Sequence, residues 1–225
     1  MDPFLQIRSL SRAYRSSEVE TQALDSVSFD VAAGEFVALM GPSGCGKSTL
    51  LNILGFLDAP DSGSYRLKGE EVAALSDARL TRLRRAHVGF VFQSFNLIDE
   101  LNVAENVEVA LLYRSGDARR RRTREVLEQV GLSHRAHHRP RQLSGGQQQR
   151  VAIARALAPE PDLILADEPT GNLDSANGAA VMDLLKGAAA AGTTVIMVTH
   201  SAVHAEAADR TIRMLDGRIV EETRL

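Results

Sequence analysis

Apolar positions along the chain fall into two kinds of pattern. Continuous apolar runs occur in "FVALM" (36–40), "DLILAD" (162–167) and "TTVIMVTH" (193–200). A run that is apolar at nearly every position is typical of a strand buried on both faces. Between the last two runs, "ANGAAVMDLLKGAAAA" (176–191) predicts a helix. Alternation of buried strands with helices predicts an α/β core built on a mainly parallel sheet.

Further strand patterns border this core. "SFDVAAGEFVALMG" (28–41) contains two strand patterns split by an Ala-Gly pair, and "GSYRLKGEEV" (63–72) predicts another strand pair. "IRMLDGRIVEE" (212–222) predicts a hairpin that turns at Asp216-Gly217. We therefore expect an N-terminal antiparallel β subdomain beside the parallel sheet.

The stretch from about 95 to 150 is more polar, and its pattern is helical. Within it, "TREVLEQVGL" (123–132) predicts an amphipathic helix that ends at Gly131. A run of four arginines (119–122) starts a helix in this stretch. We interpret the run as a solvated face, because the net charge of the chain is −3 and gives no general attraction for nucleic acid. We expect a helical subdomain at approximately 95–150, inserted into a single domain that spans 1–225.

Composition narrows the classes of protein to consider. With 225 residues, 44% of them hydrophobic, the chain has the make-up of a soluble globular protein. The single cysteine, Cys45, excludes an internal disulfide and fits a reducing compartment. No run approaches the roughly 18 apolar residues that span a bilayer, and the N-terminus lacks a signal-peptide pattern. We therefore expect a cytoplasmic protein. "HRAHH" (134–138) lies in a polar loop without acidic or thiol neighbours, so we predict no metal site there.

A glycine-rich segment provides the first candidate chemistry. "GPSGCGKST" matches G-x-x-x-x-G-K-[ST] between a predicted buried strand and a predicted helix. Such a loop turns backbone N–H groups towards phosphates, while Lys47 reaches the β- and γ-phosphates and the Ser48 hydroxyl binds Mg²⁺. The alternative is a plain glycine-rich turn, which the combination of strand, motif and helix disfavours. The expected nucleotide contacts are Gly41, Pro42, Ser43, Gly44, Cys45, Gly46, Lys47, Ser48 and Thr49. We expect the Cys45 thiol to point away from the phosphates and to play no catalytic part.

Two acidic residues follow one of the buried runs. "DLILADEPT" (162–170) delivers Asp167 to the carboxyl end of a strand, where it can bind the Mg²⁺ shell. Glu168 comes next and can polarise a water in line with the γ-phosphate. Two adjacent acids could also merely cap a helix, but their pairing with the phosphate loop favours a role in hydrolysis.

Four motifs together resemble a known family. The phosphate loop, "LSGGQ" (143–147), "LILADE" and a late "VTH" occur in this order in the ATP-binding cassette (ABC) ATPases, a branch of the P-loop NTPases. The resemblance covers nearly the whole chain, and "LSGGQ" is its most specific motif. It implies that two cassettes pair head to tail around two ATP molecules. Ser144, Gly145, Gly146 and Gln147 would then approach the γ-phosphate on the other subunit, at the start of a helix beginning near Gln147. We interpret the glutamines that follow as hydration and packing.

The resemblance carries over to further positions one at a time. Tyr14 resembles the aromatic residue that stacks on adenine, although it could also be a packed strand aromatic. Gln93, which ends the strand pattern "HVGFVFQ", resembles a glutamine that senses Mg²⁺ and links to the membrane partner. Asp174 resembles an interface aspartate. His200 resembles a histidine that contacts the γ-phosphate, although a lone histidine at a strand end is more often structural.

One position departs from the family pattern: many cassettes have Ser-Ala where this chain has Gly171-Asn172. Because of this departure, the resemblance does not predict the contacts of the interface loop. None of the expected phosphate ligands is affected. The resemblance implies ATP and Mg²⁺ as cofactors and, as partners, a second copy of the chain and a transmembrane permease subunit. No nucleic-acid partner is expected, because the net charge is −3. The resemblance places the chain at the cytoplasmic face of the inner membrane. The segment "FNLIDELNVAENV" (95–107) offers the apolar residues Phe95, Leu97, Ile98 and Leu101. They are expected to form the groove for a helix of the permease; the alternative is that they close the core of the helical subdomain.

Within the family, "VGFVFQSFNLI" and "ADEPTGNLD" look most like the lipoprotein-releasing and macrolide-exporting branch. The chain would thus be an energy-coupling ATPase for export or periplasmic mechanotransmission. An alternative is a mechanical signalling ATPase that activates a periplasmic enzyme without transport. A chromosome-organising ATPase is rejected, because only 97 positions separate Lys47 from Ser144 and leave no room for long coiled coils. A small-molecule kinase would lack "LSGGQ".

Overall fold

A computed structural model describes residues 3–15 and 20–224. Among these residues, one sheet has six strands in the order β10-β9-β3-β8-β7-β6, and all neighbours are parallel except the terminal hairpin of β9 and β10. Its strands are β3 (Phe36–Met40), β6 (Val88–Phe92), β7 (Leu163–Asp167), β8 (Thr194–Val198), β9 (Arg210–Leu215) and β10 (Arg218–Arg224). The hairpin turns at Asp216-Gly217, as the sequence predicts.

A second, antiparallel sheet forms the other layer of the fold, with the order β2-β1-β4-β5 in the described part of the chain. Its strands are β1 (Leu5–Arg15), β2 (Glu20–Val31), β4 (Ser62–Leu67) and β5 (Glu70–Glu71). This sheet is the expected antiparallel β subdomain. The α/β architecture with a mainly parallel sheet is therefore confirmed.

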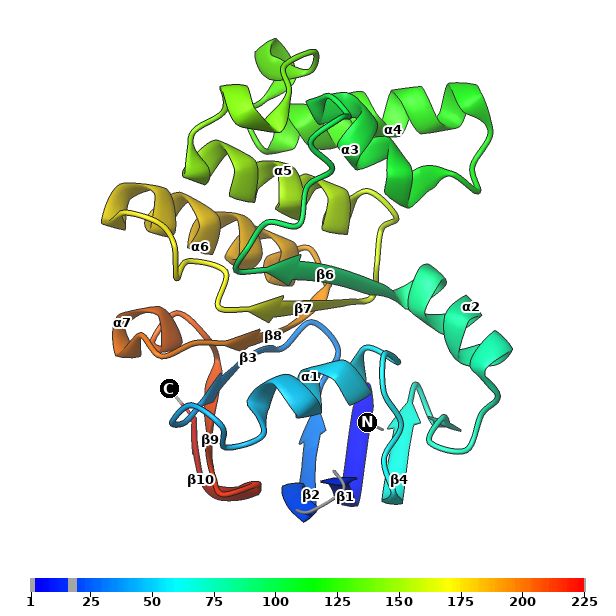
Figure 1. Ribbon diagram of the computed structural model, residues 1–225, viewed down its shortest axis with the longest axis vertical. Helices are drawn as coiled ribbons and strands as arrows, with labels where there is room; N and C mark the ends of the chain where they lie inside the picture. The colour runs from blue at the N-terminus through cyan, green and yellow to red at the C-terminus, as the bar shows by residue number, and fades with distance from the viewer. Residues whose placement is uncertain (1–2, 16–19, 225) are drawn as a thin grey trace.

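The helices lie at different places around the two sheets. They are α1 (Lys47–Leu54), α2 (Asp77–His87), α3 (Val103–Glu108), α4 (Gly116–Gln129), α5 (Gly145–Leu157), α6 (Ser175–Ala190) and α7 (Ala202–Ala205). Helix α1 lies between the two sheets, whereas α3, α4 and α5 gather at the opposite end of the molecule (Figure 1). Short 3₁₀ turns at 109–111, 133–135 and 140–142 complete that helical end. None of the helices in the described residues has the length and apolar character that a bilayer span requires.

The central strands are buried on both faces, which explains their unbroken apolar sequences. Phe36 and Ala38 of β3 belong to the core beneath the helical end. Val37 and Leu39 belong to a second core, which packs α1 between the sheets. Strands β7 and β8 alternate in the same way. Burying an aliphatic side chain contributes about 1.5 to 3 kcal/mol, so these strands form a rigid base for the loops that follow them.

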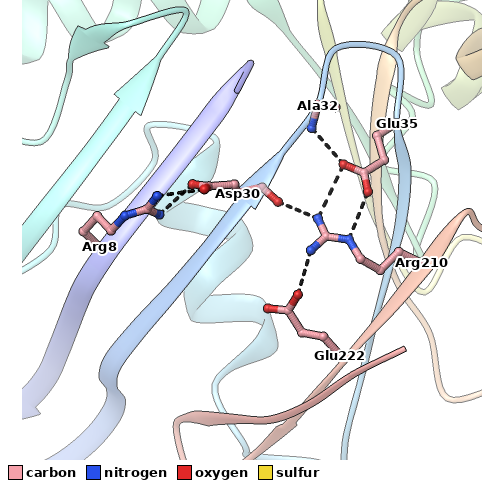
Figure 2. A network of polar contacts seen from close by, with 6 residues as sticks. All are labelled: Arg8, Asp30, Ala32, Glu35, Arg210 and Glu222. Atoms are coloured by element: carbon pink, nitrogen blue, oxygen red, sulfur yellow. Dashed lines mark hydrogen bonds and ion pairs between the residues drawn. The ribbon is translucent and has the colours of Figure 1, made fainter. Parts of the chain in front are cut away.

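A buried arginine ties the C-terminal hairpin to the rest of the sheet. Arg210 is 5% exposed, and its guanidinium donates to Glu35 at 2.9 Å, to Glu222 at 2.8 Å and to the carbonyl oxygen of Asp30 (Figure 2). Two carboxylates neutralise the buried cation, which would otherwise be costly to remove from water. The network joins the end of β2, the turn before β3 and both strands of the hairpin. It thereby fixes β9, which lies directly behind the glycine-rich loop.

Candidate nucleotide-binding site

Four neighbouring parallel strands deliver the candidate residues to one edge of the sheet. The glycine-rich loop follows β3, His200 follows β8, Asp167 ends β7, and Gln93 follows β6. Strands β3, β8, β7 and β6 are adjacent in that order, so their carboxyl ends meet at the same edge. In open α/β sheets, this edge is where ligands bind.

The glycine-rich loop fits tightly against the strands behind it. A Cβ atom on Gly46 would lie 2.2 Å from the carbonyl oxygen of Ala23, and one on Gly41 would lie 2.3 Å from that of Met214. Gly46 also has a φ of 101°, which side chains rarely adopt. The loop can therefore keep this path only with glycine. Its outer rim, Pro42, Ser43 and Gly44, is exposed to solvent.

Lys47 is held inside the loop. Its side chain is buried, and Nζ donates to the carbonyl oxygens of Gly41 and Pro42 at 2.8 Å each. The Cys45 thiol is also buried, with Sγ 3.7 Å from Nζ. Ser48 in the first turn of α1 is exposed, and Thr49 beside it is partly buried. The loop therefore presents an ammonium group and a helix N-terminus, both of which favour a bound anion.

The acidic residues lie opposite this loop. Ser48 Oγ is 3.5 Å from Asp167 Oδ2, so the hydroxyl and the carboxylate border the same space. Burial raises the pKa of Asp167, and contacts with Ser48, Lys47 and His200 oppose that shift. Burial likewise raises the pKa of Glu168. Hydroxyl, carboxylate and amide oxygens are the hard donors that Mg²⁺ prefers, so Ser48, Asp167 and Gln93 suit that ion.

No group of three or more His, Cys, Asp or Glu side chains in the described residues could hold a metal by itself. Mg²⁺ characteristically takes only one or two protein carboxylates and completes its shell with substrate phosphates and water. A single carboxylate at Asp167 with a hydroxyl and an amide nearby therefore fits Mg²⁺ bound together with a phosphate ligand.

Glu168 is constrained by its backbone and by a histidine. Its φ is 48°, which is unusual for a residue with a side chain, and its N–H donates to the carbonyl oxygen of Val198 at 3.0 Å. His200 Nε2 lies 2.8 Å from Glu168 Oε1. The structure thus brings Glu168 and His200 together. Strained backbone conformations concentrate at functional sites, where surrounding contacts hold them in place.

The segment "LSGGQ" leads into α5, which begins at Gly145 and not near Gln147 as the sequence predicts. Ser144 caps the helix: its Oγ accepts from the N–H of Gln147 at 3.3 Å, while Gln147 Oε1 accepts from the N–H of Ser144 at 3.0 Å. This reciprocal pair is a capping box, which lets the helix start two residues earlier. Both glycines therefore lie in its first turn.

The three glutamines have more specific roles than hydration and general packing. Gln147 completes the capping box, and Gln148 donates to the carbonyl oxygen of Leu143 at 3.2 Å. Gln149 is fully buried and donates to the carbonyl oxygen of Pro169 at 2.6 Å. The last contact joins α5 to the segment that carries Glu168. Sequence reasoning missed it, although Gln149 shares the buried face of the helix with Gly146 and Ile153.

Asp174 is engaged by its own helix. It caps α6, accepting from the backbone N–H of Asn177 at 2.9 Å and from the Asn177 side chain at 2.7 Å. These hydrogen bonds lower the pKa of Asp174. Asn177 in turn packs on α5, because a Cβ on Gly146 would lie 2.0 Å from its Oδ1. Asn177 is a second residue that sequence reasoning missed.

Two further predicted contacts come from α5 and from the antiparallel sheet. The N-terminal end of α5, with Ser144 to Gln147, is well separated from the start of α1 (Figure 1). Tyr14 in β1 is 42% exposed; its hydroxyl donates to Asp58 at 2.8 Å, and the Arg12 guanidinium lies 5.0 Å from its ring centre. A single chain therefore assembles the loop, the acids and His200, but leaves the "LSGGQ" end of α5 apart from them.

Known proteins share this architecture. The sequence profile of the ABC transporter family matches residues 24–171. The chain belongs to the ABC transporter family. This cassette is 51% identical over 224 residues to a macrolide export ATP-binding/permease protein, MacB 1/2, of Paracoccus denitrificans; the match covers 99% of the cassette and 34% of that protein. It thus spans about a third of the length of the MacB relatives.

Two further comparisons extend over whole chains. An uncharacterized ABC transporter ATP-binding protein of Thermotoga maritima is 49% identical over 97% of the cassette and 94% of its own length. The solved structure described as a dimeric, post-hydrolysis state of the ATP-binding cassette MJ0796 bound to ADP and Pi has a TM-score of 0.91 and 45% identity, and the match covers 98% of each chain. The cassette is therefore an ABC-type ATPase of the P-loop NTPase fold.

Proposed function

We propose that this cassette is the energy-coupling ATPase subunit of an ABC membrane complex and acts as a homodimer around two ATP molecules. Residues 1–225 would form one nucleotide-binding domain, with its helical subdomain at approximately 95–150. The observation that carries the proposal is the shared sheet edge, where Lys47, Ser48, Asp167, Glu168 and His200 converge. The cassette would work at the cytoplasmic face of the inner membrane.

Each residue at this edge has a distinct task. Backbone N–H groups of the glycine-rich loop and the Lys47 ammonium group would bind the β- and γ-phosphates. Ser48, Asp167 and Gln93 would hold Mg²⁺, which would neutralise phosphate charge when bound. Tyr14 would stack on the adenine ring from the β subdomain, where its exposed face is free of the core.

Hydrolysis requires one proton acceptor. Water attacks the γ-phosphorus, the bond to the bridging β–γ oxygen breaks, and ADP and inorganic phosphate leave. Glu168 would accept the proton of the attacking water, because its carboxylate follows the buried strand beside the phosphate site. His200, 2.8 Å from that carboxylate, would orient it and contact the γ-phosphate.

A second copy would complete each site. The Ser144 hydroxyl accepts the N–H of Gln147, so its own proton stays available for a phosphate oxygen on the partner. The N-terminus of α5 adds partial positive charge in the same direction. The solved cassette MJ0796 is described as dimeric, and a head-to-tail pair would bring the separate "LSGGQ" end of one copy to the ATP of the other. Asp174 would lie at that interface.

A mixing experiment tests the shared site. A Ser144→Ala protein and a Lys47→Ala protein should each hydrolyse ATP poorly, and their mixture should recover part of the activity. A mixed dimer would contain one intact composite site, because the two changes fall on opposite halves of the other site. Activity is measured after heterodimers are demonstrated with two affinity tags. Heterodimers that hydrolyse no more ATP than either parent would contradict independent composite sites.

The partner would be a transmembrane permease. The MacB relatives are named ATP-binding/permease proteins, and about two thirds of their length lies outside the region that this chain matches. The work performed would be export or periplasmic mechanotransmission of the macrolide-export or lipoprotein-release type. Of the four apolar residues expected to contact the permease, Ile98 is exposed, whereas Phe95, Leu97 and Leu101 are partly buried. Leu97 packs against the core, so Ile98 is the sharpest probe of this surface.

Ile98→Asp should uncouple the complex and spare the isolated cassette. A charge on an apolar contact surface opposes docking, because it must lose its water when the permease binds. Ile98 is exposed, so the change should have little effect on the free energy of unfolding. ATPase activity of the purified cassette should stay within about twofold of the unmodified protein, since surface changes usually cost under about 0.5 kcal/mol. Co-purification with the permease should fall. Normal assembly and permease-stimulated ATPase activity in this variant would place the docking surface elsewhere.

A further inference from the structure

The side chain of Gln93 is held by an asparagine on another loop. Asn172 Nδ2 donates to the backbone carbonyl oxygen of Gln93 at 3.1 Å, and Gln93 Nε2 donates to Asn172 Oδ1 at 3.3 Å. Both side chains are exposed, so general packing does not hold them in place. The two hydrogen bonds form a closed ring between the residue after β6 and the loop after β7.

The chemistry of this ring fixes the orientation of both amides. A backbone carbonyl can only accept, so it selects the amino group of Asn172 as its donor. Asn172 Oδ1 then faces the Gln93 side chain and, because it also can only accept, selects the amino group of Gln93. The remaining polar atom of Gln93, Oε1, is therefore directed away from Asn172. A side-chain amide binds a cation through its oxygen and not through its amino group.

The residue before Asn172 makes room for this arrangement. A Cβ atom on Gly171 would lie 2.7 Å from Gln93 Nε2 and 3.2 Å from its Cδ. Its φ is not in the left-handed region, so glycine at this position serves close approach and not backbone conformation. Gly171 N–H also donates to the carbonyl oxygen of Glu168 at 3.0 Å, which ties the pair to the candidate base.

We propose that Gly171 and Asn172 are positioning residues that present the amide oxygen of Gln93 to the magnesium ion. Gly171 allows the close approach, and Asn172 excludes the flipped amide that would turn an amino group towards the cation. The inference rests on the proposed function and extends it to a pair that departs from the Ser-Ala of many cassettes. The same contact connects the loop expected to face the permease with the loop that carries Glu168.

Two substitutions, each made with and without the Gln93 side chain, distinguish a positioning role from a general effect on the structure. Asn172→Ala removes both hydrogen bonds, and Gly171→Ala displaces the Gln93 amide while leaving Asn172 in place. Each change is made in the full chain carrying Glu168→Gln, so that bound ATP persists. Each is then repeated in a Gln93→Ala background, where there is no amide left to orient. Gln129→Ala, which removes an exposed amide on α4, is the matched control.

Mn²⁺ serves as the probe, and electron paramagnetic resonance measures free Mn²⁺ in the presence of ATP. Asn172→Ala and Gly171→Ala should each weaken Mn²⁺ binding by about 10-fold, as is typical when a residue that orients a metal ligand is lost. ATP binding in EDTA should not change. Neither variant should weaken Mn²⁺ binding further in the Gln93→Ala background, and Gln129→Ala should bind Mn²⁺ normally.

Unchanged Mn²⁺ binding in both variants would overturn the inference, as would losses that add to the effect of Gln93→Ala. If Asn172→Ala does not fold, Gly171→Ala carries the same test alone. The Mg²⁺ dependence of ATP hydrolysis, measured without the Glu168 change, distinguishes the two levels of failure. If the Asn172→Ala cassette hydrolyses ATP with an unchanged Mg²⁺ dependence, only the positioning role of Gly171 and Asn172 is refuted. If the cassette without any of these changes neither hydrolyses ATP nor binds Mn²⁺ with ATP, both the proposed function and the positioning role are refuted.

Discussion

Glu168→Gln is expected to slow ATP hydrolysis by about 10² to 10⁴, the range of a lost general base. Glutamine keeps the length and shape of the side chain but cannot accept a proton from water. The Asp167, Ser48 and Lys47 contacts would remain, so ATP should still bind. Single-turnover hydrolysis of radiolabelled ATP measures the chemical step directly. Hydrolysis at the unmodified rate would remove Glu168 as the base.

The same variant should also change the assembly state. Its neutral amide removes one negative charge near the γ-phosphate, which favours a closed pair of cassettes around ATP. With ATP and Mg²⁺, we expect Glu168→Gln to shift from monomer to long-lived dimer on size exclusion with light scattering, while the unmodified cassette closes only transiently. Glu206→Gln, an exposed glutamate just after α7, is the matched control and should behave like the unmodified protein. Monomer with demonstrably bound ATP would contradict a dimer held by nucleotide alone.

Lys47→Ala is expected to weaken ATP binding by about 100-fold, because losing one partner of a desolvated charge pair costs about 3 kcal/mol and each 1.4 kcal/mol is a factor of 10. The buried ammonium group also satisfies the carbonyl oxygens of Gly41 and Pro42. Its removal should therefore lower the melting temperature as well. Titration calorimetry measures the affinity, and thermal denaturation measures the stability.

Lys186→Ala controls for the loss of a positive charge, since Lys186 is exposed on α6. It should bind ATP normally and melt normally. Normal ATP affinity in Lys47→Ala would exclude the glycine-rich loop as the phosphate site. A lower melting temperature alone, without weaker binding, would confine Lys47 to holding the loop together.

Much of the fold follows from local sequence. The unbroken apolar runs predict β3, β7 and β8, because every side chain of a strand that is buried on both faces lies in a core. Helix α2 was not predicted, since it contributes no fully buried residue and only Leu80 and Leu83 pack against the core. A mostly charged segment of this kind gives a weak helical pattern. Long-range pairing, such as β1 with β4, depends on contacts that local spacing does not encode.

The candidate site divides in the same way. Residues whose role depends on a short motif, such as Lys47 and Glu168, are evident from the sequence. Residues that hold others in place, such as Gln149 and Asn177, lie outside the motifs. Asn172 lies inside a motif, but its hydrogen bonds to Gln93 depend on the contact between two loops. The early start of α5 was missed because capping depends on a side chain three positions ahead, whereas the glycines suggested a loop.

The contacts of α5 have a mechanical consequence. Gln149 donates to the carbonyl oxygen of Pro169, next to Glu168, and Gly146 is packed against Asn177, which donates to Asp174. Any tilt of α5 must therefore pull on both ends of the segment 169–174. In the proposed head-to-tail pair, α5 of one subunit would approach the γ-phosphate of one site, while Glu168 of the same subunit would act at the other. Release of phosphate from one site would then shift the catalytic geometry of its twin, so each site would turn over at a rate that depends on the state of the other.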